Sequence, residues 1–284
     1  MDDLHDKRRF YADELKVTAN LRTPGLVDAL AQVPREKFLS PGPWLIRSEI
    51  DIGGGPRKTP DADPRHVYHN VAIAIDPDRQ LFNGAPSLVC TCIDALALTA
   101  GARVLHVGCG TGYYSALIAH TVGNSGSVIA IDIDESLAET ARRNLQNMPW
   151  VEVRNGNGTD VSGESFDAIF VNAGVTHPHE RWLDALKPGG RLLLPLTFTA
   201  PAMGSIGKGV MTLTTRDGDA WHARVVTITA IYSALDIRDD RMNGRLCDAF
   251  MKGGLMPAFS RMRRDAHEPS PECWLHGDTF CFSK

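Results

Sequence analysis

The sequence lacks the features of several large protein classes. No apolar run is long enough to span a bilayer, and the charged residues Met1 to Phe10 lack the apolar segment of a secretory signal. The six cysteines are scattered over 284 residues without the paired spacing of a disulfide framework. No repeat or low-complexity tract is visible. We therefore expect a protein of the reducing cytoplasm, without a membrane partner.

An excess of positive charge is also missing. The chain has 30 lysines and arginines against 34 aspartates and glutamates, which gives a formal net charge of −4. Binding to a nucleic-acid backbone needs a broad basic face, so we expect no nucleic-acid partner. The hydrophobic fraction of 43% is that of an ordinary globular protein with a sizeable core.

What the chain does have is a regular alternation of short apolar strands and helices from residue 103 onward. Two segments that flank Asp217-Gly218 then alternate like an antiparallel hairpin. This order indicates an α/β fold: a doubly wound, mostly parallel, seven-stranded Rossmann-like sheet with an antiparallel terminal hairpin. The parallel strands are predicted at 104–107, 128–131, 151–153, 166–171 and 191–196, and the hairpin strands at 210–215 and 221–231.

The regions on either side of this pattern are less regular. Helices are predicted at 7–21 and 25–31, before a loop-rich stretch from 40 to 64. The tail from residue 236 is polar and irregular, with one predicted helix at 239–251. We therefore divide the chain into an N-terminal helical and loop region (1–80), a cofactor-binding domain (81–235) and a C-terminal extension (236–284).

A glycine-rich loop follows the first parallel strand. Ligands of open α/β sheets bind beyond the carboxyl ends of the strands, and glycines let the backbone approach a ligand closely. A dinucleotide fingerprint would need a glycine at position 113, which is Tyr113 here. We therefore predict that Gly108, Gly110 and Gly112 hold a cofactor without a pyrophosphate, and that Cys109 supplies the small side chain that suffices in this loop.

The second parallel strand ends at an acidic residue, Asp132. A carboxylate at this place can accept hydrogen bonds from both ribose hydroxyls of an adenosine, and Ile133 would lie against one face of the adenine. The glycine loop, this acidic strand end and the later Pro188-Gly189-Gly190 turn occur together at the expected distances. The combination predicts a methyltransferase that uses S-adenosyl-L-methionine.

The stretch from 103 to 196 resembles the class I S-adenosylmethionine-dependent methyltransferases. Residues 33–38, Val-Pro-Arg-Glu-Lys-Phe, are similar to the V-P-R-E-x-F signature of the protein-L-isoaspartate O-methyltransferases, and Gly156-Asn157-Gly158 corresponds to their G-D-G segment. The resemblance implies that Asn157 lies near the adenine amino group and that Gly158 and Asn172 help to hold the cofactor. It also implies a carboxylate acceptor in a peptide or protein.

The chain departs from that family in the lid segment, residues 81–86. The family has Q-T-I-S-x-P, whereas this chain has Leu-Phe-Asn-Gly-Ala-Pro. The family's hydroxyl positions fall on Phe82 and Gly84, so Asn83 is the one side chain nearby with comparable donor and acceptor capacity. We predict that Asn83 is the catalytic residue and that Phe82, Gly84, Pro86 and His177 contact the acceptor.

The chemistry of the acceptor stays open among three functions. A carboxylate is already anionic and needs only alignment with the sulfonium donor, whereas an amine or phenol would be helped by a base such as His177 or His179. The segment Asn172-Ala173-Gly174-Val175 differs from the N-P-P-Y type and argues against a nucleic-acid base. The chain is therefore an isoaspartyl-type carboxyl methyltransferase, a small-metabolite methyltransferase, or a cofactor-binding protein without turnover.

A few metal-ligand residue types occur near the C-terminus. Cys273, His276 and Cys281 suit zinc, but the second close pair of a structural zinc site is missing. We therefore predict no metal site, and instead a packed tail that contains Trp274 and Phe280.

Overall fold

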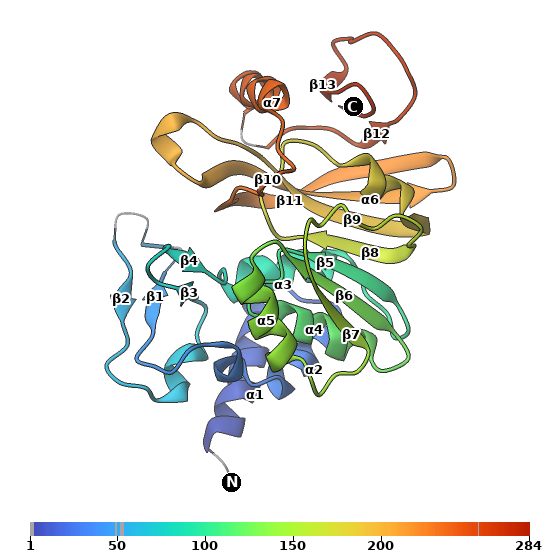
Figure 1. Ribbon diagram of the computed structural model, residues 1–284. Coiled ribbons are helices and arrows are strands. Elements are labelled where there is room, and N and C mark those ends of the chain that lie inside the picture. Colours follow the sequence, from blue (N-terminus) through green and yellow to red (C-terminus); the bar gives the residue numbers. More distant parts are fainter. Residues whose placement is uncertain (1–2, 49, 52–53, 255) are drawn as a thin grey trace. The chain divides into compact units, whose positions relative to one another are not determined.

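The computed structural model describes residues 3–48, 50–51, 54–254 and 256–284 (Figure 1). The chain folds into two compact units, each made of segments that are separated in sequence. The first unit comprises Met1–Gly101, Cys109–Ala130 and Asp134–Asn155, and the second comprises Ala102–Gly108, Ile131–Ile133 and Gly156–Lys284.

The first unit has a helical core, as the sequence predicts. Helix α1 (Asp3–Thr18) packs on α2 (Pro24–Gln32), which packs on α4 (Tyr113–Val122). Helix α2 starts with a proline in its first turn, where no intrahelical N–H is required. Apolar residues at helical spacing close this core, and the fully buried ones include Leu15, Leu26, Leu30 and Leu117.

A small antiparallel sheet begins in the stretch 40–64, which the sequence predicts to be rich in loops, and continues to residue 82. Its strand order is β2-β1-β3-β4. The strands have two to five residues, too few for an alternating pattern to stand out, and this is why the prediction of loops was incomplete. The sheet consists of β1 (Leu45–Arg47), β2 (Arg57–Lys58), β3 (Ala72–Asp76) and β4 (Leu81–Phe82), with the short helices η1 (Arg35–Phe38) and η2 (Pro64–Val67) beside it in sequence.

The remaining elements of the first unit follow the predicted alternation. They are α3 (Pro86–Ala95), the first residues of β6 (Ser127–Asp132), α5 (Glu135–Asn144) and β7 (Val151–Asn155). The side chain of Asp134 caps α5, because its carboxylate accepts hydrogen bonds from the backbone N–H groups of Ser136 and Leu137. This cap fixes where the chain turns from β6 into the helix.

The second unit contains a long mixed sheet. Strand β5 (Arg103–Val107) pairs in parallel with β8 (Phe166–Val171), and β8 pairs in parallel with β9 (Leu186–Phe198). Strands β10 (Ile206–Asp217) and β11 (Ala220–Tyr232) then form the predicted antiparallel hairpin beside β9 (Figure 1). The α/β fold, mostly parallel with an antiparallel terminal hairpin, is thus confirmed.

Strand β9 is longer than predicted. The sequence predicts a turn at Pro188-Gly189-Gly190 before the strand, but the strand begins at Leu186 and runs through these residues. Phe166 is paired with Leu186, and a register shift follows before Ala168 pairs with Arg191. The extra residues are accommodated by this irregularity and by Gly189, whose φ of 78° suits glycine. Helix α6 (Glu180–Asp184) comes just before β9.

The C-terminal extension is more regular than the sequence predicts. Helix α7 (Asp240–Gly253) confirms the predicted helix, but the rest of the tail contributes β12 (Arg261–Arg263), β13 (Cys273–His276) and β14 (Cys281–Ser283). These short strands continue the sheet beyond β11 in the order β12, β14, β13. The predicted aromatic packing is confirmed, since Phe280 and Phe282 are buried and Trp274 lies 5.3 Å from Phe250, ring to ring. None of the described helices has the length and apolar character to cross a membrane.

Candidate functional site

The carboxyl ends of β5 and β8 lie side by side in the second unit. Val107 is opposite Val171 in the parallel register, and the N–H of Asn172 donates to the carbonyl of Val107 at 2.8 Å. Gly108 follows with a φ of 76°, and a Cβ there would lie 3.2 Å from the carbonyl oxygen of Asn172. Position 108 therefore needs glycine for its backbone angle and for the close approach of Asn172.

Asp132 lies at the same edge of this unit. The N–H of Gly108 donates to the carbonyl of Ile131 at 2.8 Å, and the N–H of Gly156 donates to the carbonyl of Asp132 at 3.0 Å. Asp132 is only 8% exposed, whereas Ile133 beside it is 39% exposed. The end of β6 thus combines a buried carboxylate with an apolar surface, the two groups that the adenosine prediction requires.

Asn157 and Gly158 continue this edge. The side-chain oxygen of Asn157 accepts hydrogen bonds from the N–H and the hydroxyl of Thr159, at 3.0 and 2.9 Å. A Cβ at position 158 would lie 2.2 Å from Cγ1 of Val107, so any side chain here would force Val107 to shift. The carbonyl of Gly158 accepts a hydrogen bond from Nε1 of the fully buried Trp182 at 2.8 Å. Trp182 is not among the predicted site residues; it lies here because a buried indole N–H needs an acceptor.

His177 belongs to the loop after β8. Its Nδ1 lies 2.9 Å from the hydroxyl of Thr176, and its ring stacks on Phe280 with a centroid distance of 6.3 Å. Burial lowers the pKa of His177, and the neighbouring His179 lowers it further. The imidazole is therefore neutral at physiological pH, which is the form that can accept a proton.

The glycine loop Cys109–Gly112 lies in the first unit. Gly110 and Gly112 have φ angles of 56° and 94°, and the backbone of Gly112 starts helix α4. A Cβ at position 112 would lie 2.9 Å from Cδ1 of Leu145, so glycine is required by the angle and by the packing. Cys109 is 6% exposed, in keeping with the small side chain predicted for this position.

The lid segment also lies in the first unit. Phe82 ends β4, and its ring packs under the guanidinium of Arg47 at 4.5 Å from the centroid. Gly84 has a φ of 75°, and its carbonyl accepts a hydrogen bond from the hydroxyl of Tyr114 at 3.1 Å. Pro86 begins α3. The segment is therefore a structured link between β4 and α3.

Asn83 is tied to the chain by its amide oxygen. This oxygen accepts hydrogen bonds from the N–H of Ile73 at 3.1 Å and from Arg35 at 3.4 Å, while the N–H of Asn83 donates to the carbonyl of Ile73 at 3.0 Å. Among the described atoms, its buried amide nitrogen Nδ2 has no hydrogen-bond partner. The amide oxygen of Asn83 thus stabilises the local structure, and its Nδ2 is a donor that a ligand can use.

Arg35 holds this region together. The side chain is fully buried, and it donates to the carbonyls of Val67, His69 and Val71 at 2.9, 3.1 and 2.9 Å. A buried cation is tolerated only when such acceptors replace its water. In the sequence, Arg35 stands out only as part of the Val-Pro-Arg-Glu-Lys-Phe segment. Its structural role depends on carbonyls more than thirty residues away, for which the sequence carries no local signal.

The predicted site residues fall into two groups. The structure brings Gly108, Asp132, Ile133, Asn157, Gly158 and Asn172 to neighbouring strand ends of the second unit, where His177 also lies. Cys109, Gly110 and Gly112 belong to the first unit, as do Phe82, Asn83, Gly84 and Pro86. The predicted roles of all these residues stay predictions.

Comparison with known proteins shows a consistent relationship. The chain is 28% identical over 179 residues to a protein-L-isoaspartate O-methyltransferase of Thermotoga maritima, a match over 61% of this chain and 50% of that protein. It is 32% identical over 177 residues to one of Syntrophobacter fumaroxidans, over 61% of this chain and 62% of that protein. The matches thus span about half to two thirds of these relatives.

Solved structures share the fold. A protein-L-isoaspartate O-methyltransferase superposes with a TM-score of 0.64 at 23% identity, over 80% of this chain and 66% of the other. A structure from Plasmodium falciparum, named as such an enzyme in complex with S-adenosyl-L-homocysteine, superposes with a TM-score of 0.58 at 17% identity. The match covers 80% of this chain and 97% of the other. The family of protein-L-isoaspartate(D-aspartate) O-methyltransferases (PCMT) matches residues 57–210. The chain belongs to the protein-L-isoaspartate(D-aspartate) O-methyltransferase family.

Proposed function

We propose that this protein is an S-adenosylmethionine-dependent methyltransferase that esterifies the carboxyl group of isoaspartyl residues in peptides or proteins. The observation that carries the proposal is the strand-end arrangement in the second unit. There a buried carboxylate, Asp132, lies at the same edge as Gly108 and Gly158, two positions where a Cβ would crowd neighbouring atoms. Family membership supports the same activity.

The residues of the second unit fit an adenosine. Asp132 would accept hydrogen bonds from the ribose hydroxyls, and the partly exposed Ile133 would cover one face of the adenine. The oxygen of Asn157 already accepts two hydrogen bonds from Thr159, so Asn157 would offer its Nδ2 as a donor to an adenine ring nitrogen. When bound, S-adenosylmethionine supplies an electrophilic methyl group on a positively charged sulfur. The roles of Cys109, Gly110, Gly112 and Asn172 are proposed from the sequence.

The acceptor side needs a donor more than a base. A carboxylate is ionised near neutral pH, so the protein has to orient it and exclude water rather than remove a proton. Nδ2 of Asn83, buried and without a described partner, would donate to a carboxylate oxygen of the acceptor. Phe82, Gly84 and Pro86 belong to the same segment as Asn83, so we place them around the acceptor as well. The six free cysteines support a place in the reducing cytoplasm.

A matched pair of peptides tests the proposal. The protein is incubated with S-adenosylmethionine and either an isoaspartyl peptide or its aspartyl isomer, and mass spectrometry measures the addition of one methyl group. The proposal predicts methylation of the isoaspartyl peptide alone. If S-adenosylhomocysteine binds but neither peptide is methylated, the isoaspartyl assignment is wrong. A screen of small carboxylates, amines and phenols then tests the small-metabolite alternative, in which His177 acts as the base.

A further inference from the structure

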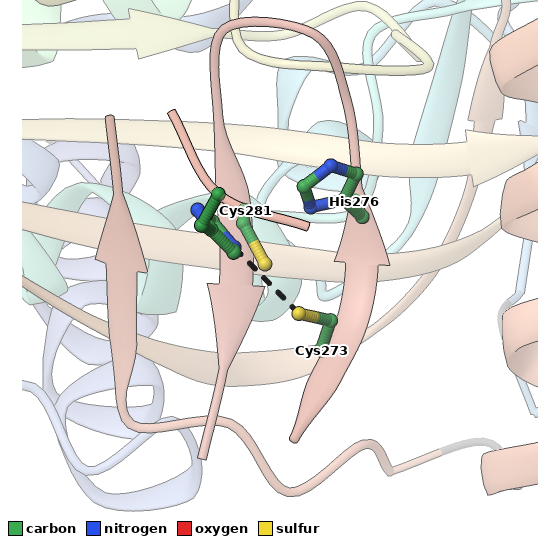
Figure 2. Close-up of side chains that lie close together, drawn as sticks. Cys273, His276 and Cys281 are labelled. Atoms are coloured by element: carbon green, nitrogen blue, oxygen red, sulfur yellow. Dashed lines mark hydrogen bonds between the residues drawn. The ribbon is translucent and has the colours of Figure 1, made fainter. Parts of the chain in front are cut away.

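The C-terminal extension gathers four side chains of one chemical kind. His267, Cys273, His276 and Cys281 each offer a ring nitrogen or a sulfur, and these four atoms lie within 4.8 Å of one another. Figure 2 shows Cys273, His276 and Cys281 pointing toward one another from neighbouring strands. The sequence predicted no metal site, because Cys273, His276 and Cys281 lack the fourth ligand that would complete a second close pair. His267, six residues before Cys273, is that ligand.

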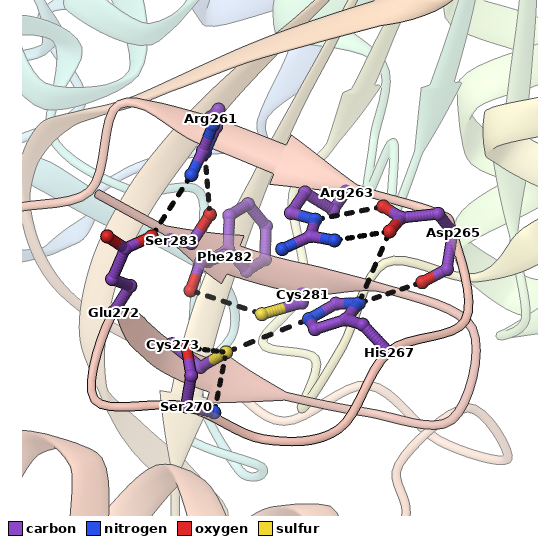
Figure 3. Close-up of polar contacts among 10 residues, drawn as sticks. All are labelled: Arg261, Arg263, Asp265, His267, Ser270, Glu272, Cys273, Cys281, Phe282 and Ser283. Carbon is purple, nitrogen blue, oxygen red and sulfur yellow. Dashed lines mark hydrogen bonds and ion pairs between the residues drawn. The ribbon is translucent and has the colours of Figure 1, made fainter.

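The fold brings the four together through a hairpin and one loop. In the β13–β14 pair, His276 is opposite Cys281, and the turn is closed by a hydrogen bond from the N–H of Gly277 to the carbonyl of Phe280 at 2.9 Å. Cys273 begins β13. His267 comes from the connection between β12 and β13, which has no regular structure of its own. Its side chain lies over this hairpin (Figure 3).

His267 is oriented as metal-binding histidines are. Its Nδ1 lies 2.9 Å from the carbonyl oxygen of Asp265, so that N–H donates there and Nε2 keeps its lone pair. Nε2 lies 3.7 Å from Sγ of Cys273. Asp265 is itself held by an ion pair with Arg263 (Figure 3). A ligating histidine typically uses its second nitrogen in this way, and such partners fix the ring for the metal.

The other ligands also have environments that suit a metal. Sγ of Cys273 accepts a hydrogen bond from the N–H of Ser270 at 3.4 Å, as a thiolate does, and the hydroxyl of Ser270 lies 3.6 Å away. Nδ1 of His276 is buried and has no hydrogen-bond partner among the described atoms. An unsatisfied buried nitrogen is costly, and a metal bond to this imidazole would orient it and lower that cost.

We propose that His267, Cys273, His276 and Cys281 bind one zinc ion in a closed, four-coordinate structural site. Two thiolates and two imidazoles are a preferred zinc set, with bonds of about 2.0–2.3 Å, which places tetrahedral ligand atoms about 3.3–3.8 Å apart. The observed spread of 4.8 Å therefore needs a contraction of about 1 Å. Binding forms four metal–ligand bonds and releases the two thiol protons to solvent.

The ion would fasten the irregular loop 264–272 to the hairpin. Four protein ligands leave no open position, so the site has no catalytic role of its own. The turn between His276 and Cys281 carries Phe280, whose ring stacks on His177 in the loop after β8. Loss of the metal should therefore loosen this contact as well as the C-terminal strands.

Metal content of the full-length chain tests the site. The protein is purified without chelators, and zinc is measured by mass spectrometry together with the protein concentration. We expect one zinc per chain in the wild type and in the control variants Cys247→Ser and His222→Asn, which change a cysteine and a histidine outside the cluster. We expect less than a tenth of that in Cys273→Ser/Cys281→Ser. Equal zinc in the wild type and the double variant would overturn the proposal.

A second measurement uses only the unaltered chain. Zinc is removed with a chelator and Co²⁺ is added under reducing conditions. The proposal predicts the visible absorption of tetrahedral cobalt together with thiolate charge-transfer bands, and displacement of both by zinc. A folded chain that shows neither signal contradicts it. So does a Cys273–Cys281 disulfide in freshly purified protein, because that bond would consume both thiolates.

Discussion

Two regions of the molecule hold irregular chain in place by different means. In the first unit, the buried guanidinium of Arg35 binds three backbone carbonyls between residues 67 and 71 and the amide of Asn83. In the C-terminal extension, the loop 264–272 approaches a hairpin through a cluster of cysteines and histidines. The first region is held by hydrogen bonds within the polypeptide, whereas the second, on our proposal, is held by an ion.

The two regions should respond differently to acid and to chelators. A hydrogen-bonded arginine does not change its charge in the accessible pH range, so its contribution should not respond to chelators or to mild acid. Thiolates and imidazoles lose a metal when they are protonated, so the second fastening should respond to both. The two regions can therefore be separated by the conditions under which each one fails.

The largest expected effect is that of removing the arginine. Arg35→Met keeps an apolar stem but leaves the carbonyls of Val67, His69 and Val71 and the oxygen of Asn83 without this donor. We expect the free energy of unfolding to fall by about 3–5 kcal/mol, because several acceptors lose their donor at a cost of about 1–3 kcal/mol each when they are not rehydrated. Urea denaturation measures this loss. Lys37→Met, an exposed lysine of the same short helix, should change stability by about 0.5 kcal/mol or less.

Chelation should destabilise the other region. An ion present at about a hundred- to a thousandfold excess over its dissociation constant stabilises the folded chain by about 3–4 kcal/mol. Thermal denaturation with and without a chelator measures this, and the chelator should leave Cys273→Ser/Cys281→Ser unchanged. Among the described residues, Arg35 and the cluster share no hydrogen-bond partner, so the loss in Arg35→Met should be equal under both conditions. Unequal losses would contradict the independence of the two regions.

Lowering the pH should also destabilise the protein through a buried histidine outside the cluster, His106 on β5. Burial lowers the pKa of His106 to about 3, whereas an unfolded histidine has a pKa of about 6.5. The neutral ring thus contributes its stability fully above pH 6.5, and this is lost as the pH falls toward 3. The expected loss is about 1.4 kcal/mol per pH unit, or about 2–3 kcal/mol between pH 6.5 and pH 4.5.

The variant His106→Phe tests this assignment. The ring of His106 stacks on Phe170 at 5.0 Å and 12°, so phenylalanine keeps the packing without the titration. Chelated protein is used, so that release of the metal does not contribute. Between pH 6.5 and 4.5 the variant should lose less stability than the wild type, while His222→Gln, at an exposed position, should follow the wild type. Identical slopes for His106→Phe and the wild type would contradict the assignment.

A smaller loss of stability is expected at Gly158, a strand-end position of the second unit where a side chain would clash with Val107. Gly158→Ala brings a methyl group to 2.2 Å from Cγ1 of Val107. We expect a loss of about 1–3 kcal/mol from this overpacking. In Gly158→Ala/Val107→Ala the clash is removed, so the double variant should be more stable than the sum of the two single losses predicts. Simple additivity in a denaturation series would show that the contact is not the cause.

Much of the fold could be predicted because its signals are local. Strand β8 has the predicted bounds, since a continuous apolar run marks it within a few residues. The strand-end positions Gly108 and Asp132 follow from the same alternation. They lie at the carboxyl edge because parallel strands place their ends together.

What could not be predicted depends on contacts between distant residues. The acceptors of Arg35 come from a loop with no pattern of its own, and the short strands β1–β4 carry too few residues to alternate visibly. In the tail, Cys273, His276 and Cys281 were visible in the sequence, but the approach of His267 depends on how the loop after β12 folds back. Spacing alone did not reveal the fourth ligand.

The central claim is that the strand ends of the second unit bind S-adenosylmethionine through Asp132. Isothermal titration with S-adenosylhomocysteine tests it most directly, on the wild type, Asp132→Ala and the control Asp160→Ala, which removes an exposed carboxylate paired with Arg181. Loss of hydrogen bonds to a charged acceptor should weaken binding by about 10- to 100-fold in Asp132→Ala. Asp160→Ala should bind like the wild type. Unchanged affinity in a folded Asp132→Ala protein would contradict the account.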